Sequence, residues 1–166
     1  MVEITEKKDC CGCSACVNVC PRGCVSMERD GEGFFYPRVD REKCVSCGLC
    51  EKVCPVLHPP AAPEGAPEAF AAFGSPEDRK GSSSGGVFAG LARQVLEQGG
   101  LVFGAAMGEN QEYAAHVGID SLAELPKLQG SKYLQSRMGD CFRQAKKALD
   151  AGKAVLFTDT PCQIEG

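Results

Sequence analysis

The chain has 166 residues, of which 43% are hydrophobic, and a formal net charge of −4. Lys and Arg are scattered along it and Trp is absent, so the composition does not support nucleic-acid binding. No apolar run approaches the ~20 residues that a membrane-spanning helix needs. Residues Met1–Cys10 do not resemble an apolar signal segment, and we therefore expect a protein of the reducing cytoplasm.

Twelve residues are cysteine, and eight of these form two copies of one pattern. Both copies read C-x2-C-x2-C-x3-C-P, and their cysteines are Cys10, Cys13, Cys16 and Cys20, then Cys44, Cys47, Cys50 and Cys54. This spacing is typical of a bacterial-type ferredoxin with two [4Fe-4S] clusters. Residues 1–57 are therefore predicted to form a ferredoxin domain that transfers electrons.

In the two-cluster arrangement, the fourth cysteine of each run binds the cluster of the other run. We therefore assign Cys10, Cys13, Cys16 and Cys54 to one cluster, and Cys44, Cys47, Cys50 and Cys20 to the other. Structural zinc is the alternative, but zinc sites normally use two separated C-x2-C pairs. Disulfides are disfavoured because a reducing compartment keeps the thiols free for metal.

Between the two cysteine runs, the sequence predicts a β-hairpin with strands at Val25–Met27 and Phe34–Tyr36. Residues 58–68 are rich in Pro and Ala, whose restricted backbone predicts a semi-rigid linker. We interpret His58 as part of this linker, since four thiolates already complete each cluster.

Residues 69–166 alternate strand and helix signals and predict an α/β domain, so that the whole chain is of the α+β class. A short apolar run at Phe70–Phe73 is followed by a Ser/Gly segment and then by a helix that ends at Gly99-Gly100. The apolar face of this helix is predicted to comprise Val87, Phe88, Leu91, Val95 and Leu96.

Further strands are predicted at Leu101–Phe103, Tyr113–Val117 and Ala154–Phe157, and the last is followed by a loop at Thr158–Gln163. Between them, Asp140 is expected to cap a helix that closes at Gly152. Its apolar side is predicted to comprise Cys141, Phe142, Ala145, Ala148 and Leu149.

Two stretches of this domain are candidates for binding a cofactor. Ser82–Gly86 precedes a helix, where hydroxyl and N–H groups can hold a phosphate, although a flexible linker with an N-cap explains the same residues. Thr160–Gln163 follows the carboxyl end of a strand, where open α/β sheets place their ligands.

Several motifs, which follow one another along essentially the whole chain, resemble those of a known protein family. They are Gly33-Phe34 and Tyr36-Pro37, Ser83–Phe88, Gly99–Ala106, Gly130–Ser136 and Thr160–Ile164. With the cysteine runs, they resemble the beta subunit of the coenzyme F-420 hydrogenase/dehydrogenase family. In that family, a two-cluster ferredoxin segment precedes a domain that binds flavin.

The resemblance implies an oxidoreductase subunit that relays electrons between its clusters and FAD, with a deazaflavin as two-electron partner in the namesake enzymes. A redox partner protein or other subunits of a complex are implied as well. The residues expected near the flavin or its phosphates are Ser83, Ser84, Gly85, Gly86 and Lys132, and the same site would be lined by Thr160, Pro161, Cys162 and Gln163. The alternatives are a ferredoxin-type electron carrier without flavin and a fragment whose clusters mainly hold structure.

Two departures from the family pattern stand near the C-terminus. Asp159 replaces the usual glycine before Thr160, where we expect backbone strain and an unfavourable charge beside a phosphate. The sequence ends at Gly166, whereas relatives continue, and we therefore expect an incomplete flavin-type domain.

The remaining cysteines and one histidine have less specific patterns. Cys11 is interpreted as a bystander and Cys24 as a packed residue of the hairpin. Cys141 fits an apolar helix face, while Cys162 is the better candidate for a ligand of a further cluster such as some relatives bind. His116 alternates with apolar neighbours, which favours a hydrogen-bonded structural histidine over a catalytic one.

Overall fold

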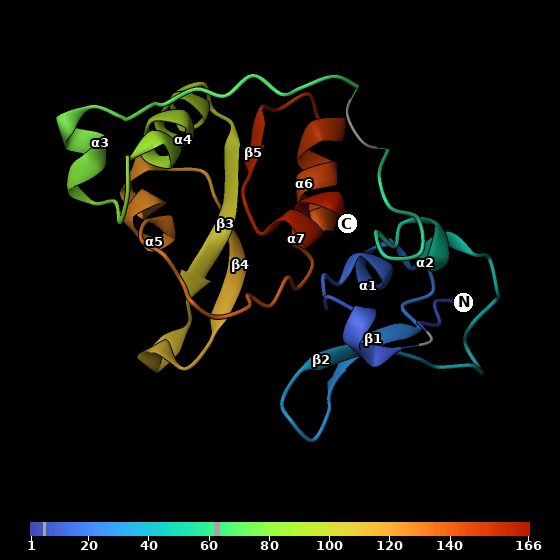
Figure 1. Ribbon diagram of the computed structural model, residues 1–166. Helices are drawn as coiled ribbons and strands as arrows, with labels where there is room; N and C mark the ends of the chain where they lie inside the picture. Colours follow the sequence, from blue (N-terminus) through green and yellow to red (C-terminus); the bar gives the residue numbers. More distant parts are fainter. Residues whose placement is uncertain (5, 62–63) are drawn as a thin grey trace. The chain divides into compact units, whose positions relative to one another are not determined.

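The computed structural model describes residues 1–4, 6–61 and 64–166, and the chain divides into two compact units (Figure 1). The first unit comprises Met1–Ala62 together with Thr160–Gly166, and the second comprises Pro63–Asp159. The C-terminal residues thus belong with the cysteine runs, and not with the segment 69–166 in which the sequence places them. The predicted linker at 58–68 falls across the division, and its residues 62 and 63 lie outside the described residues.

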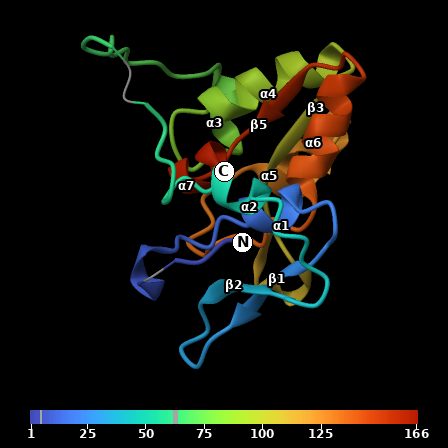
Figure 2. The same ribbon diagram turned by 90° about the vertical axis from the view of Figure 1, so that its right-hand side faces the viewer.

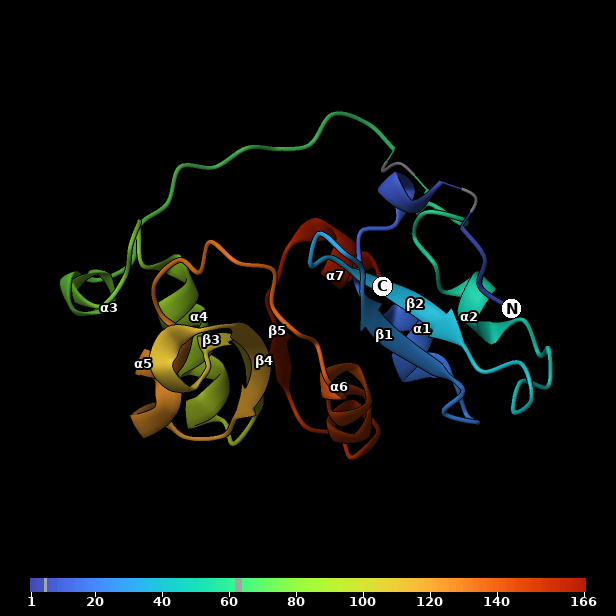
Figure 3. The ribbon, with the colours of Figure 1, turned by 90° about the horizontal axis from the view of Figure 1, so that it is seen from below.

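The first unit is built from a hairpin and short helices (Figures 2 and 3). Strands β1 (Val25–Arg29) and β2 (Phe35–Val39) are antiparallel, with Val25 opposite Val39 and Arg29 opposite Phe35. The predicted hairpin is therefore confirmed, with longer strands. Its turn is held by the Asp30 carboxylate, which accepts hydrogen bonds from two backbone N–H groups of the turn at 3.0 and 3.1 Å.

The helices of the first unit are all short. They are the 3₁₀ helix η1 (Lys7–Asp9) and the α-helices α1 (Ala15–Val19), α2 (Leu49–Lys52) and α7 (Pro161–Glu165). The last of these corrects the sequence prediction of a loop through Gln163, because Pro161 at the first helical position has a backbone already suited to a helix.

Cysteines make up much of the core of the first unit. Its buried members are Val2, Cys16, Cys24, Val25 and Cys50. A core this small stabilises a fold weakly through the hydrophobic effect alone. The unit therefore depends on what its cysteines bind.

The second unit is a three-stranded sheet with helices on both faces. Strand β3 (Leu101–Met107) lies at its centre, antiparallel to β4 (Ala114–Ile119) and parallel to β5 (Val155–Phe157). The α-helices are α3 (Pro76–Lys80), α4 (Val87–Glu97), α5 (Leu125–Leu128) and α6 (Cys141–Asp150), and the 3₁₀ helices are η2 (Glu109–Gln111) and η3 (Leu122–Glu124). Together with the first unit, this mixture of helices and strands agrees with the predicted α+β class.

The alternation of side chains along β3 sends its residues into two separate cores. Val102 and Ala106 pack with residues of α4 and α5, whereas Phe103 packs with Met138 and the buried face of α6. Figure 1 shows α4 and α5 on one side of the sheet and α6 on the other. The apolar residues in this part of the sequence are consecutive, as expected for a strand that is buried on both faces.

Several sequence expectations for the second unit are wrong in detail. The short apolar run Phe70–Phe73 lies outside the helices and strands, and Phe70 and Phe73 remain 83% and 78% exposed. On α4, Val87 and Leu91 are exposed, while the small residues Ala89 and Ala92 face the sheet because they allow the helix close to it. On α6, Leu149 is exposed, and the Asp140 side chain makes no N-cap hydrogen bond, since it accepts one from the Gln144 side chain at 2.7 Å.

Among the residues that the structure describes, no helix is both long enough and apolar enough to cross a membrane.

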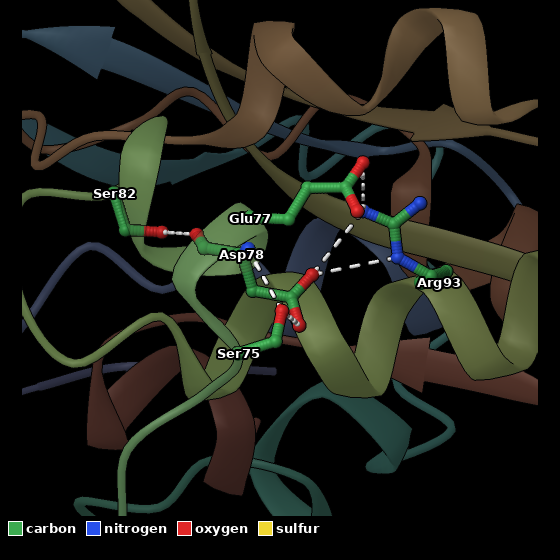
Figure 4. Close-up of polar contacts among 5 residues, drawn as sticks. All are labelled: Ser75, Glu77, Asp78, Ser82 and Arg93. Carbon is green, nitrogen blue, oxygen red and sulfur yellow. Dashed lines mark hydrogen bonds and ion pairs between the residues drawn. The ribbon is translucent and has the colours of Figure 1, made fainter.

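Asp78 ties α3 to α4 (Figure 4). Its backbone N–H donates to the Ser75 hydroxyl at 3.1 Å, and that hydroxyl donates to the Asp78 carboxylate at 2.7 Å. The Arg93 guanidinium on α4 lies 3.2 Å from the same carboxylate, and the Ser82 hydroxyl donates to the Asp78 carbonyl at 2.7 Å. The hydrogen bond from Ser75 and then the Arg93 charge hold the pKa of Asp78 below its usual range, against the opposing effect of burial.

Replacing Asp78 by Asn is expected to lower the melting temperature at pH 7, since Asn carries no charge for Arg93. A carboxyl with a lowered folded-state pKa stabilises above its unfolded pKa, about 3.9, and this stabilisation is lost as the pH falls through the folded value. The melting-temperature difference between wild type and Asp78→Asn, followed by circular dichroism, should therefore shrink below about pH 4. Asp150→Asn, which removes an exposed pair with Lys146, serves as the control and should change little at any pH.

Candidate functional site

The eight cysteines of the two runs gather around two hollows in the first unit. The first hollow is lined by three cysteines of the first run and the last cysteine of the second, namely Cys10, Cys13, Cys16 and Cys54. Its other walls are mostly apolar and include Val2, Ile4, Met27, Pro37 and Val56. A group bound here would be held away from water, which is one determinant of redox potential.

The second hollow has the complementary set of cysteines. It is lined by Cys20, Cys44, Cys47 and Cys50, so the last cysteine of each run crosses to the other hollow. The structure thus brings together the same two groups of four that the motif spacing suggests.

A single metal ion and a [4Fe-4S] cluster place their thiolate ligands differently. Among the described residues, no three His, Cys, Asp or Glu side chains converge as ligands of one metal ion would. Zinc would hold its sulfurs about 2.3 Å from one centre. In a [4Fe-4S] cluster each iron takes its own thiolate, so the four sulfurs stand further apart.

Left-handed backbone positions shape both cysteine loops. Gly12 and Ser14 in the first loop, and Ser46 and Gly48 in the second, have φ between +51° and +77°. Such positions turn successive N–H groups toward one side, where they form a concave anion site. The N-terminal segment adds a further donor, since the Val2 N–H donates to the Cys50 sulfur at 3.1 Å. N–H donors of this kind tune the potential of a bound cluster.

The surroundings of the two hollows shift the pKa values of their thiols in opposite directions. Burial, helped by the nearby Cys13 and Cys10, raises the pKa of Cys16 to about 12. Burial alone would also raise the pKa of Cys20, but hydrogen bonds led by the Cys24 N–H and thiol lower it overall. Metal binding must therefore expel protons from the most buried ligands, and the lowered pKa of Cys20 makes its proton easier to displace.

Cys24 is a fifth cysteine at the second hollow. It is buried as the sequence suggested, but its sulfur lies 3.4 Å from that of Cys20, and it also lines the hollow. The motif spacing could not indicate this position, because Cys24 lies outside the repeated pattern.

Cys11 and Cys162 also belong to the first unit. Burial, helped by the nearby Cys13 and Cys162, raises the pKa of Cys11 to about 12, although the sequence marked this residue as a bystander. Next to Cys162, Gln163 is almost fully buried and accepts a hydrogen bond from the Thr160 hydroxyl at 2.9 Å. Cys141, by contrast, is buried in the core formed by α6, as its helical pattern predicted.

The Ser/Gly segment lines a cavity of about 370 Å³ at the N-terminus of α4. Its lining is wholly uncharged and comprises Ala72, Ser82, Ser83, Ser84, Gly85, Gly86, Val87, Phe88, Leu128, Gln129, Gly130 and Ser131. The Ser83 and Ser131 hydroxyls lie 2.8 Å apart and join the two sides of this cavity. Gly86 has φ +77°, and a Cβ there would lie 2.9 Å from the Arg79 nitrogen, so only glycine fits.

Two features of this cavity favour an anionic group. The positive end of an eleven-residue helix opens at it without a side-chain cap, and no carboxylate lines it. Lys132 does not line it, because its ammonium donates to the Gln129 and Lys127 carbonyls at 2.7 and 3.2 Å. Thr160–Gln163 belong to the other unit, so a single site made of both groups of residues stays a prediction.

His116 and Asp159 form a buried pair within the second unit. The His116 Nε2 atom lies 3.1 Å from the Asp159 carboxylate, and Nδ1 lies 2.8 Å from the Ser136 hydroxyl. The ring also stacks on Phe157, with 5.5 Å between centroids. Both ring nitrogens therefore have partners in a closed core, which matches the expectation of a structural histidine.

The strain expected at Asp159 is absent. Among described residues other than glycine, positive φ angles occur at Ser14, Ser46, Asn110 and Gln111 only. The Asp159 side chain is 5% exposed beside His116 and does not line the Ser/Gly cavity.

Comparison with known proteins supports the interpretation of the cysteine runs. Residues 9–57 match the family model of the 4Fe-4S dicluster domain. Over 98% of its length, the chain is 24% identical to one of the subunits of the F(420)H(2) dehydrogenase of Methanosarcina mazei, and it covers 49% of that relative.

Two further relatives match the cysteine-rich part alone. An uncharacterized ferredoxin of Methanocaldococcus jannaschii is 36% identical over 31% of this chain and 66% of its own length. Pyruvate synthase subunit PorD of Methanothermobacter marburgensis is 33% identical over 31% of this chain and 53% of its own length. The chain thus spans between about half and two thirds of the relatives it matches, and it contains an iron–sulfur domain of the electron-transfer type.

Replacing His116 by Phe is expected to cost about 3 kcal/mol of unfolding free energy, because the buried Asp159 carboxylate then loses the polar imidazole that lies 3.1 Å from it. The aromatic contact with Phe157 is kept by the new side chain. In the double variant His116→Phe, Asp159→Asn, part of the loss should be recovered, as read by urea unfolding of the full chain. An equal loss in the single and double variants would show that the pair contributes nothing beyond packing.

Proposed function

We propose that this chain is an iron–sulfur oxidoreductase subunit that relays single electrons through two [4Fe-4S] clusters to or from a flavin. The observation that carries the proposal is the crossing of Cys20 and Cys54, which gives each hollow three cysteines of one run and one of the other. The first cluster would be bound by Cys10, Cys13, Cys16 and Cys54, and the second by Cys44, Cys47, Cys50 and Cys20.

The second cluster is the better placed to exchange electrons with a partner protein. Of the eight proposed ligands, all of which the structure describes, Cys47 alone is exposed. Val45 and Leu49 beside it are 60% and 39% exposed and offer apolar contact to a docking protein. A partner seated there would come close to the cluster without any large movement of the chain.

The flavin part of the proposal rests on the Ser/Gly cavity and on the relative that matches nearly the whole chain. Ser83, Ser84, Gly85 and Gly86 would hold a phosphate of FAD, because they combine hydroxyl donors with the free N–H groups of α4. A bound flavin converts between one- and two-electron chemistry. From the printed name of the Methanosarcina mazei relative, we propose a deazaflavin as the two-electron partner and other subunits of an oxidoreductase complex as neighbours.

The cluster assignment predicts a loss of iron that depends on the position replaced. Protein purified without oxygen should hold about eight iron and eight sulfide per chain. Cys50→Ser should lower the iron content to about four, with the loss of one paramagnetic signal after reduction, whereas Cys141→Ser should keep about eight. Iron content and electron paramagnetic resonance are measured on the same sample. If Cys50→Ser retains all of its iron, the assignment is wrong.

The cavity assignment predicts that FAD binding is sensitive to a methyl group at Gly86. Gly86→Ala should weaken FAD binding at least about tenfold, since a Cβ there meets the Arg79 backbone and distorts the start of α4. Gly31→Ala is the matched control, because nothing lies within 4 Å of its Cβ. Quenching of flavin fluorescence on titration with each protein gives the affinity, and circular dichroism checks the fold.

If wild type holds both clusters but binds no FAD, the chain acts as a ferredoxin-type carrier. If Gly86→Ala binds FAD as wild type does, the flavin lies elsewhere.

A further inference from the structure

A cavity of about 330 Å³ lies in the first unit, lined by the N-terminal segment on one side and by strand β2 on the other. The proposed electron relay does not use this cavity. Its volume falls within the range of small-molecule pockets, about 300–1,000 Å³. We refer to it as the N-terminal cavity.

Part of the lining of the N-terminal cavity is apolar. Val2 and Ile4 contribute from the N-terminal segment, and Pro37 and Val39 contribute from β2, together with the ring of Tyr36. Val2 is only 6% exposed, so this part of the wall is anchored in the core of the unit. An apolar or aromatic group that enters the cavity would therefore leave water for an apolar surface.

The charged part of the lining is mainly cationic. Lys7, Arg38 and Arg41 line the cavity, against a single carboxylate, that of Glu3. This local excess of positive charge contrasts with the formal net charge of −4 of the whole chain. The combination of an apolar wall with cationic side chains suits an organic anion.

The three cations are available to such an anion. Arg38 lies 3.0 Å from the Glu28 carboxylate and Lys7 lies 3.9 Å from that of Asp30, but the two cationic side chains are 72% and 69% exposed. Exposed ion pairs of this kind are weak, so a bound carboxylate can share these cations. The Arg41 side chain makes no hydrogen bond or ion pair with any other residue that the structure describes.

The N-terminal cavity shares a wall with the first hollow. Cys10, a proposed ligand of the first cluster, lines both spaces, and so do Val2, Ile4 and Pro37. A molecule bound in the cavity would therefore stand next to the first cluster, where its charge acts through protein and not through bulk water.

We propose that the N-terminal cavity binds an organic anion with an aromatic or apolar body and one carboxylate, and that the bound anion lowers the reduction potential of the first cluster. A negative charge beside the cluster disfavours the added electron. By thermodynamic linkage, the anion binds the oxidised protein more tightly than the reduced protein by the same factor. Binding itself needs no cluster, whereas the effect on the potential rests on the proposed function.

The first experiment compares three probes by titration calorimetry on the full chain, purified without oxygen. They are 2-naphthoate, its neutral analogue 2-naphthamide, and acetate, which has the carboxylate without the rings. We expect one naphthoate per chain, and binding at least about tenfold weaker for each of the other two probes. Equal affinities for naphthoate and naphthamide, or for naphthoate and acetate, would overturn the proposal.

Matched variants locate the probe. Arg41→Gln should weaken naphthoate binding at least about fivefold at unchanged iron content. Lys52→Gln is the control, because it removes an exposed cation of the same unit that does not line the cavity, and it should bind naphthoate as wild type does. If Gly86→Ala weakens naphthoate binding and Arg41→Gln does not, the probe lies in the Ser/Gly cavity and the proposal is wrong.

The second experiment tests the effect on the cluster. Redox titrations followed by electron paramagnetic resonance are carried out with and without saturating 2-naphthoate. We expect the potential of one cluster to fall by about 40 mV, which corresponds to about fivefold tighter binding to the oxidised protein, and to fall less in Arg41→Gln at the same naphthoate concentration.

The possible failures are distinguishable. Unchanged potentials in wild type with naphthoate bound would refute the coupling to the first cluster. Wild type without iron would refute the proposed relay, and the calorimetric comparison of the three probes would still decide whether the cavity binds an organic anion.

Discussion

The structure of the first unit depends on the crossing of two cysteines between its halves. Cys20 leaves the first run to meet the second hollow, and Cys54 does the reverse. Few apolar side chains are buried in this unit, and three of the five residues at the centre of its core are cysteines. The bonds that these sulfurs form with a cluster would therefore provide cohesion that a hydrophobic core provides in larger domains. The left-handed residues of both loops follow from the same constraint, because they direct N–H groups toward the sulfurs.

The second unit is held by ordinary packing, and its sheet places polar groups at well-defined positions. Val102 and Phe103, neighbours in sequence, enter different cores on the two faces of β3. Asp78 ties α3 to α4 through Arg93, and the loop between these helices forms one wall of the Ser/Gly cavity. The cavity is therefore supported by a charged contact that is itself outside it. Because of this separation, no carboxylate lines the cavity that we propose for a phosphate.

The sequence predicted most reliably what depends on local chemistry. The cysteine spacing encodes a cluster-binding loop within a few residues, and the hairpin is indicated by the turn at Asp30 and Gly33. The sequence failed where packing decides. On α4 the hydrophobic pattern favoured Val87 and Leu91 for the core, but helix and sheet approach each other through Ala89 and Ala92. Short apolar runs such as Phe70–Phe73 gain strand structure only if a neighbouring strand offers hydrogen bonds, and the sequence does not encode that neighbour.

Contacts between distant residues could not be predicted from a single sequence, and they change the meaning of the C-terminal motif. Asp159 looked like an unfavourable replacement for glycine, yet its backbone is unstrained and its carboxylate is the partner of His116. One residue later the chain enters the segment that belongs with the cysteine runs. Adjacent residues of the motif therefore serve different units, because Asp159 packs beside His116 in the second unit, whereas Thr160 and Pro161 begin α7 of the first.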